Sequence, residues 1–181
     1  MRILGLSGSL RKGSFNSALL RAAAQIMPPG SELEIGSIAG IPLYDGDLET
    51  EQGLPSAVAD LKERIANADG LLLASPEYNN SLPGVFKNAI DWTTRPASDI
   101  DRVFKGRKVA LIGASAGAHG TILSQNAWLP VLRTLGMDFW AGGRLMVPRA
   151  GALFDASGAL VDDKIRDRLR SFLDGFVAYL R

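Results

Sequence analysis

The sequence predicts an α/β protein in which helices cover both faces of a parallel sheet. Short, continuous apolar runs such as GLLLA at 70–74 and KVALIGA at 108–114 alternate with segments whose apolar residues recur at helical spacing. Strands that are apolar along their whole length are typical of parallel sheets, because helices bury both faces. Five such strand segments are present, which fits one doubly wound sheet.

The predicted elements alternate regularly along the chain. In chain order we expect a strand from Met1, a helix at 15–27, a strand at 33–38, a helix from Pro55 through Ile65, a strand from Gly70, a helix at 83–95, a strand from Lys108, a helix at 121–135, a strand within 137–148 and a helix at 162–181. The polar stretch 41–55 and the segment 95–106 predict connecting loops. Pro130 predicts a kink or an irregular turn, and Gly142 and Gly143 interrupt the last strand.

Composition and charge narrow the class of protein. With 181 residues and 46% hydrophobic content, the chain fits a single domain spanning residues 1–181. The net charge of +1 gives no argument for a nucleic-acid or membrane partner. The absence of cysteine excludes disulfides, thiolate catalysis and cysteine-bound metal. No apolar run reaches the roughly 20 residues of a membrane helix, and no secretory h-region is present, so we expect a cytoplasmic protein without a metal site.

Three unusual loops follow three of the predicted strands. They are SGSLRKGSFN at 7–16, SPEYNNSLPG at 75–84 and ASAGAHG at 114–120. Because the carboxyl ends of parallel strands lie at one edge of a sheet, we expect the loops to converge there, where such sheets bind ligands.

The first loop has the composition of a phosphate site. Gly8 and Gly13 permit close backbone approach, the helix that begins near Phe15 offers free N–H groups, and Arg11 adds a cation. Hydroxyl donors come from Ser7, Ser9 and Ser14. The loop matches neither the P-loop nor the G-x-G-x-x-G fingerprint. The alternative is a capped helix with a solvated arginine.

The second and third loops could contact a flat ligand, but their residues indicate it less specifically than the first loop indicates a phosphate. Tyr78 at a loop tip offers an aromatic ring, and Asn79 offers both a donor and an acceptor to a heterocycle. The alternative is a turn in which asparagine tolerates positive φ while Tyr78 packs inward. The small residues of 115–120 allow a backbone to approach a ring edge, or else serve helix packing. His119, the single histidine, is a candidate for either catalysis or plain solvent contact.

Two motifs give the chain a resemblance to a known family. GSLRKGSFN at 8–16 and SPEYNNSLPGVFKNAIDW at 75–92, together with IPLYDGD at 41–47, resemble the NADPH-dependent FMN reductase family, in its chromate and quinone reductase branch. The resemblance spans almost the whole chain. It implies a flavodoxin-like three-layer sandwich, with a five-stranded parallel sheet in the order 2-1-3-4-5 and FMN at the strand ends.

The resemblance also implies roles for residues of all three loops. The FMN phosphate would be held by Ser9, Arg11, Ser14, Phe15 and Asn16. The ribityl chain and isoalloxazine would lie beside Pro76, Glu77, Tyr78 and Asn79, and the pyrimidine end of the ring would contact Ser115 and Gly117. Relatives often have a glycine pair late in the third loop. Here Thr121 follows Gly120, which we expect to affect the substrate range.

The activity that the resemblance implies is reduction of small molecules by NADPH or NADH through FMN. A shared open flavin face implies ping-pong kinetics with two-electron transfer to quinones, chromate, azo or nitro compounds. No catalytic side chain is assigned. The alternatives are a flavodoxin-type FMN electron carrier, a flavin-free member of the fold, and an FMN reductase that supplies reduced flavin to a monooxygenase.

Two further expectations concern the surroundings of the site. Arg95, after the third helix, is expected near the site, where it would meet a phosphate of NADPH or a partner subunit; the alternative is a solvated helix end. The resemblance implies a homodimer or homotetramer. Most of the aromatic-rich region around Trp128 and Trp140 is expected to be core, with the remainder at a subunit interface.

Overall fold

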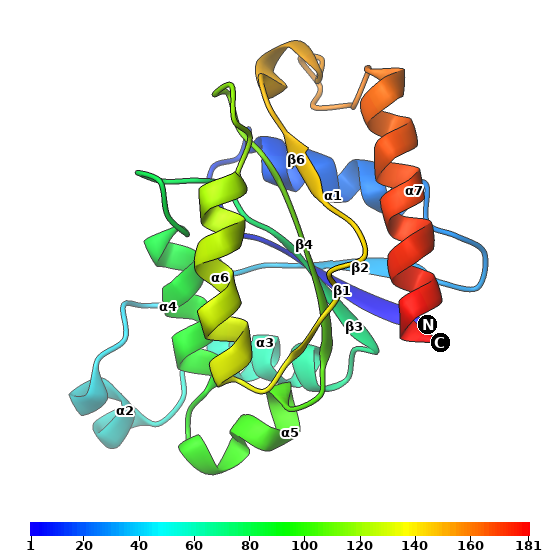
Figure 1. The fold of residues 1–181 in the computed structure, drawn as a ribbon. Helices are drawn as coiled ribbons and strands as arrows, with labels where there is room; N and C mark the ends of the chain where they lie inside the picture. The colour runs from blue at the N-terminus through cyan, green and yellow to red at the C-terminus, as the bar shows by residue number, and fades with distance from the viewer.

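The computed structural model describes residues 1–181 and contains the expected parallel sheet (Figure 1). Its order is β2-β1-β3-β4-β5, and β6 pairs with β4 beyond the end of β5. All of the pairings are parallel. The strands are β1 (Arg2–Ser7), β2 (Glu32–Gly36), β3 (Gly70–Ala74), β4 (Lys108–Ala114), β5 (Asp138–Phe139) and β6 (Leu145–Val147). The predicted order is therefore confirmed, with the fifth position divided into two short strands.

Trp140 explains why the fifth strand is divided. Its ring packs edge-on against Phe172, with 4.9 Å between ring centroids, and only 9% of the residue is exposed. A Cβ atom at Gly142 would lie 2.5 Å from the indole nitrogen, and one at Gly143 would lie 2.6 Å from the ring. The chain therefore leaves the sheet where the indole is buried, and the two glycines, which the sequence predicted to interrupt the strand, make room for it.

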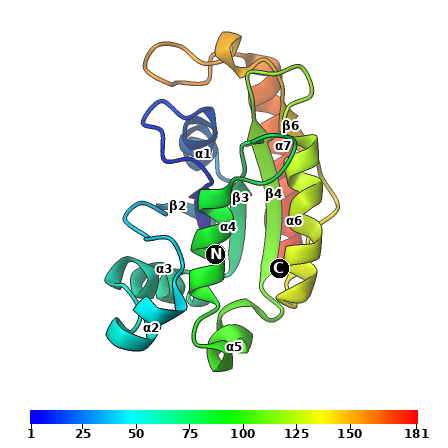
Figure 2. The same ribbon diagram turned by 90° about the vertical axis from the view of Figure 1, so that its left-hand side faces the viewer.

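The chain forms seven helices, and all except the peripheral α2 pack on the two faces of the sheet (Figures 1 and 2). Apolar side chains of the first and last helices form one core with one face of the sheet, and α3 to α6 form the other core with the opposite face. Strand residues alternate between the cores, so Ile3 belongs to the first and Leu4 to the second. The helices are α1 (Phe15–Gln25), α2 (Gly46–Gln52), α3 (Ser56–Ala66), α4 (Gly84–Thr93), α5 (Ile100–Phe104), α6 (Ile122–Thr134) and α7 (Asp163–Leu180).

Two segments expected to be loops contain short helices. In 41–55, the Asp45 side chain accepts a hydrogen bond from the Asp47 amide and caps α2, and Gly53 ends it with φ of 72°. This helix buries none of its residues, so it has no apolar periodicity to detect. In 95–106, α5 has only 5 residues, which are too few to show a helical periodicity of apolar residues. α6 continues through Pro130 to Thr134, so no irregular turn interrupts the helix there.

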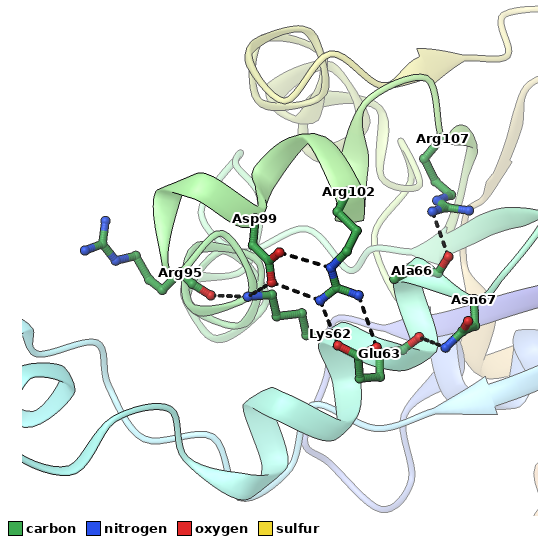
Figure 3. A network of polar contacts seen from close by, with 8 residues as sticks. All are labelled: Lys62, Glu63, Ala66, Asn67, Arg95, Asp99, Arg102 and Arg107. Atoms are coloured by element: carbon green, nitrogen blue, oxygen red, sulfur yellow. Dashed lines mark hydrogen bonds and ion pairs between the residues drawn. The ribbon is translucent and has the colours of Figure 1, made fainter.

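An ion-pair network fastens α3 to α5 at the edge where the strands begin (Figure 3). Lys62 on α3 is 2% exposed, lies 2.7 Å from the Asp99 carboxylate and donates to the carbonyl of Arg95. Arg102 on α5 donates to both Asp99 and Glu63, at 2.9 Å and 2.7 Å. Its hydrogen bonds are the main cause of the lowered pKa values of both carboxyl groups. The network therefore holds a segment that contributes few apolar side chains of its own.

None of the seven helices combines the length with the hydropathy that crossing a bilayer requires.

We expect Gly113→Ala to destabilise the protein by about 1–3 kcal/mol, the usual range for overpacking a core. A Cβ atom there would lie 2.5 Å from the carbonyl oxygen of Ser75 and would overlap the buried hydroxyl of Thr121. Urea denaturation measures the change. Gly84→Ala is the matched control, since nothing lies within 4 Å of its Cβ position, and it should unfold at the wild-type urea concentration or above. Equal midpoints for the two variants would contradict the packing described for β4.

We expect the ion-pair network to make the protein acid-sensitive. Because the folded pKa values of Asp99 and Glu63 lie below their ordinary values, the two groups stabilise the fold above about pH 4. This contribution is lost as the pH falls through the lowered values. The urea midpoint should therefore fall less steeply below about pH 4 in Asp99→Asn than in the wild type. Asp174→Asn, which removes an exposed carboxylate without an ion pair, should retain the wild-type slope.

Candidate functional site

The three unusual loops meet at one edge of the sheet, as expected. Strands β1, β3 and β4 are neighbours, and Ser7 stands beside Ala74 at their carboxyl ends. The Gly8 amide donates to the carbonyl of Ala74, and the Ser75 amide donates to that of Ile112, both at 2.9 Å. Figure 2 shows the loops after β1, β3 and β4 gathered in the upper half of the molecule. The chain moves from β1 outward to β2 and then back to β3, so this edge is a topological switch point.

The first loop presents unpaired donors at the start of α1. The buried hydroxyl of Ser14 caps the helix by accepting from the Ser17 amide at 3.3 Å. The amides of Phe15 and Asn16 donate to no protein acceptor. Arg11 is exposed and forms no ion pair, and its amide donates to the Ser9 hydroxyl. Free amides, hydroxyls and a cation at the positive end of a helix fit the phosphate of FMN.

The side chains of Phe15 and Asn16 have protein partners instead of facing this loop. The Phe15 ring stacks on Phe154, with centroids 5.8 Å apart. The Asn16 amide group donates to the carbonyl of Ala114 and accepts from its N–H, both at 2.9 Å. Only the backbone N–H groups of these two residues are therefore free for a ligand.

The second loop turns tightly after the buried Pro76. Tyr78 and Ser81 exchange two backbone hydrogen bonds of 3.1 Å, and Asn79 and Asn80 adopt φ of 50° and 62°. The Tyr78 side chain does not pack inward, since the residue is 42% exposed. The asparagines thus have the turn role that their sequence allows, while Tyr78 offers its ring to the outside.

Glu77 has an unexpected partner. One oxygen of its carboxylate, Oε2, accepts from the amides of Leu123 and Ser124, at 2.9 Å and 3.1 Å. These amides belong to the first turn of α6, whose own N-cap residue, Thr121, makes no side-chain cap. Glu77 therefore supplies the N-terminal cap of a helix that begins 45 residues further along the chain.

The third loop is held by a segment that sequence reasoning missed. The Ser115 amide donates to the carbonyl of Val147, the Ala150 amide donates to the carbonyl of Ser115, and the Arg149 amide donates to that of Gly117, all at 2.9–3.0 Å. The amides of Ala116 and Gly117 keep no protein acceptor. Arg149 is exposed and has φ of 50°. The signal that could have revealed 147–150 is its place directly after the last strand, at the same edge as the other loops.

The structure changes the account of two residues expected near the site. Thr121 is fully buried and packs against Gly113, so its side chain does not project into the loop, and its effect on the substrate range stays a prediction. Arg95 follows the end of α4, whereas the site lies at the start of that helix, about 15 Å away by the rise of ten residues. Its guanidinium pairs with Glu49 at 2.8 Å and lowers the pKa of that carboxyl group.

His119 is exposed in the third loop and forms no hydrogen bond. Trp128 is fully buried and Trp140 almost so, which confirms that these aromatic residues are core, while Leu129 is 38% exposed.

Comparison with known proteins agrees with the geometry. The family model described as NADPH-dependent FMN reductase matches residues 1–152. An NAD(P)H-dependent FMN reductase of Pseudomonas aeruginosa is 42% identical over 181 residues, which cover 100% of this chain and 96% of the relative. A 2-hydroxy-1,4-benzoquinone reductase of a Burkholderia species is 36% identical, with 100% and 97% coverage.

A solved structure extends the agreement to three dimensions. FerB, a flavoenzyme NAD(P)H:(acceptor) oxidoreductase from Paracoccus denitrificans, superposes with a TM-score of 0.87 at 33% identity, covering 99% of this chain and 96% of that one. The fold is therefore flavodoxin-like. The chain belongs to the NADPH-dependent FMN reductase family and is an oxidoreductase with FMN as its cofactor and NAD(P)H as its reductant.

Proposed function

We propose that this protein reduces quinones, and related acceptors such as chromate, azo and nitro compounds, with electrons from NADPH or NADH. The observation that carries the proposal is the meeting of three loops with unpaired backbone donors at the switch point of the sheet. The Burkholderia relative is named for a quinone, which supports this acceptor class.

We assign the parts of FMN to the three loops. The phosphate would be held in the first loop by the hydroxyls of Ser9 and Ser14, the guanidinium of Arg11 and the amides of Phe15 and Asn16. The second loop, Pro76 to Asn79, would contact the ribityl chain and the ring, with the exposed ring of Tyr78 available to the flavin. The third loop would contact the pyrimidine end through Ser115 and Gly117.

The protein contributes binding and electrostatics, while bound FMN supplies the two-electron chemistry. The amides of Ala116 and Gly117 have no protein acceptor, so they would be free to donate to negative charge at the pyrimidine end of bound FMN, as oxyanion donors do. No side chain at this edge is needed as a general acid or base. NAD(P)H and the acceptor use the same open face in turn, which predicts ping-pong kinetics.

We also propose that residues 1–181 act as one FMN-binding domain in the cytoplasm, where NAD(P)H is available, and that copies associate as a homodimer or homotetramer. An apolar groove beside α6 supports association between copies. The exposed side chains of Ile122, Leu123 and Leu129 line it together with Phe139 and Met146 of the neighbouring strands. Because α6 directly follows the third loop, a second copy seated there would help to wall the flavin site.

We expect the holoprotein to be reduced by NAD(P)H and reoxidised by a quinone. The test is an anaerobic absorbance titration of the FMN-loaded protein, first with NADPH or NADH and then with benzoquinone. Rapid loss and full return of the flavin absorbance supports the proposal. A flavin spectrum that neither nucleotide changes would overturn it in favour of an electron carrier, and stimulation only by excess FMN would indicate a supplier of reduced flavin.

We expect Arg11→Ala to weaken FMN binding by about 1.5–3 kcal/mol, the contribution of a hydrogen bond to a charged group. Riboflavin, which lacks the phosphate, should bind the variant as it binds the wild type. Lys12→Ala is the matched control, because it removes a neighbouring exposed cation that has no assigned contact. Fluorescence titration of the apoprotein measures the affinities. An unchanged FMN affinity in Arg11→Ala would remove Arg11 from the phosphate site.

A further inference from the structure

We propose that Asn16 and Glu77 are positioning residues, whose side chains hold the third loop in place for the flavin without binding the phosphate or the ring themselves. The inference rests on the proposed FMN site. It changes the role of both side chains from ligands of the cofactor to links between the loops that bind it, while the backbone amide of Asn16 keeps its place in the proposed phosphate site.

Asn16 fixes the start of the third loop. Its side chain pairs with both the N–H and the carbonyl of Ala114, the last residue of β4, at 2.9 Å each. The residue is only 3% exposed, and its partner is 98 residues away in the sequence. A side-chain amide carries both a donor and an acceptor, so it can pair with the carbonyl and the N–H of a single residue, as it does here. The pairing thus joins the first turn of α1 to the residue before Ser115.

Glu77 fixes the end of the same loop. Its Oε2 atom accepts from Leu123 and Ser124 in the first turn of α6, where unpaired amides and the helix dipole favour a negative charge. The loop from Ser115 to Thr121 is therefore fixed at both ends, by a side chain from the first loop at one end and by a side chain from the second loop at the other.

Buried contacts next to Glu77 show that this end of α6 is anchored. The hydroxyls of Ser75 and Ser124 lie 2.8 Å apart, and the indole N–H of Trp128 donates to Ser75, also at 2.8 Å. All three residues are fully buried. The helix is thus attached to the end of β3 independently of Glu77, so a Glu77 variant is expected to displace the third loop while α6 remains packed.

A positioning role and a ligand role predict different responses to the flavin phosphate. The third loop meets the ring, which FMN and riboflavin share, whereas the first loop meets the phosphate, which only FMN has. If Asn16→Ala or Asn16→Asp displaces the loop, the dissociation constants of FMN and riboflavin should rise by the same factor, about tenfold for two lost hydrogen bonds. If the Asn16 side chain contacted the phosphate instead, its variants would weaken the binding of FMN but not of riboflavin. The loss would be largest in Asn16→Asp, which adds a negative charge.

The experiment measures FMN and riboflavin dissociation constants for the wild type, both Asn16 variants and Arg11→Ala, by fluorescence titration of the apoproteins. It also compares the absorbance spectra of the proteins saturated with FMN. We expect equal weakening and an altered ring spectrum for the Asn16 variants, with FMN-selective weakening and an unaltered spectrum for Arg11→Ala. FMN-selective weakening in the Asn16 variants, or wild-type affinity and spectrum, would overturn the positioning role.

Glu77→Ala and Glu77→Gln test the other link. The amide oxygen of glutamine can still accept from both N–H groups, so Glu77→Gln should bind both flavins within about threefold of the wild type, the cost of losing the charge at a helix terminus. Glu77→Ala should weaken the binding of FMN and riboflavin by the same factor and alter the absorbance spectrum of the bound flavin ring. Equal defects in the two variants, or no defect in Glu77→Ala, would overturn the assignment.

Controls separate loop position from folding and from the FMN site itself. Thermal unfolding of each apoprotein identifies a variant that has lost its fold. In that case Glu77→Gln and the more conservative Asn16 variant decide the question. A wild-type protein that binds neither flavin would contradict the proposed FMN site. Wild-type binding combined with unaffected variants would contradict only the positioning roles.

Discussion

The parallel pairing of β3 with β1 on one side and β4 on the other is the constraint on which the rest of the structure depends. It brings three loops from distant parts of the sequence to one edge. The pairing is tight at its end, where Gly113 leaves room for the carbonyl of Ser75 and the buried hydroxyl of Thr121. A side chain at Gly113 would separate the second loop from the third, so close packing of the strand ends determines the geometry of the site.

At this edge, several side chains hold the loops while backbone groups remain free. Ser14 caps α1, Asn16 pairs with Ala114, and Glu77 caps α6, whereas the amides of Ala116 and Gly117 have no acceptor. A cofactor that meets mainly backbone amides needs small residues beside it, because side chains would keep it at a distance. This accounts for the composition of the third loop better than a catalytic role for any one side chain there.

The sequence predicted the strands and the converging loops because both depend on local patterns. Apolar runs mark β3 and β4, and glycine with hydroxyl residues marks the loop before α1. The partners of Asn16 and Glu77 were not predictable, since Ala114 and Ser124 lie 98 and 47 residues away and no periodicity connects them. The errors have similar causes: α2 buries no apolar residue, and the direction of the Thr121 side chain depends on a glycine in the neighbouring strand.

The distribution of exposed side chains bears on the choice of acceptor. Apart from cations such as Arg149, the larger side chains that the loops expose are those of Leu10, Tyr78, Asn79, Asn80 and His119, and none of these five side chains forms a hydrogen bond. Strong discrimination between ligands requires buried polar groups that the wrong ligand would leave unpaired. The polar side chains that this edge exposes are solvated rather than buried, so under the proposed function we expect access to the flavin to decide which acceptors react. Use of several acceptors would then follow from the same open edge that makes the loops good partners for FMN.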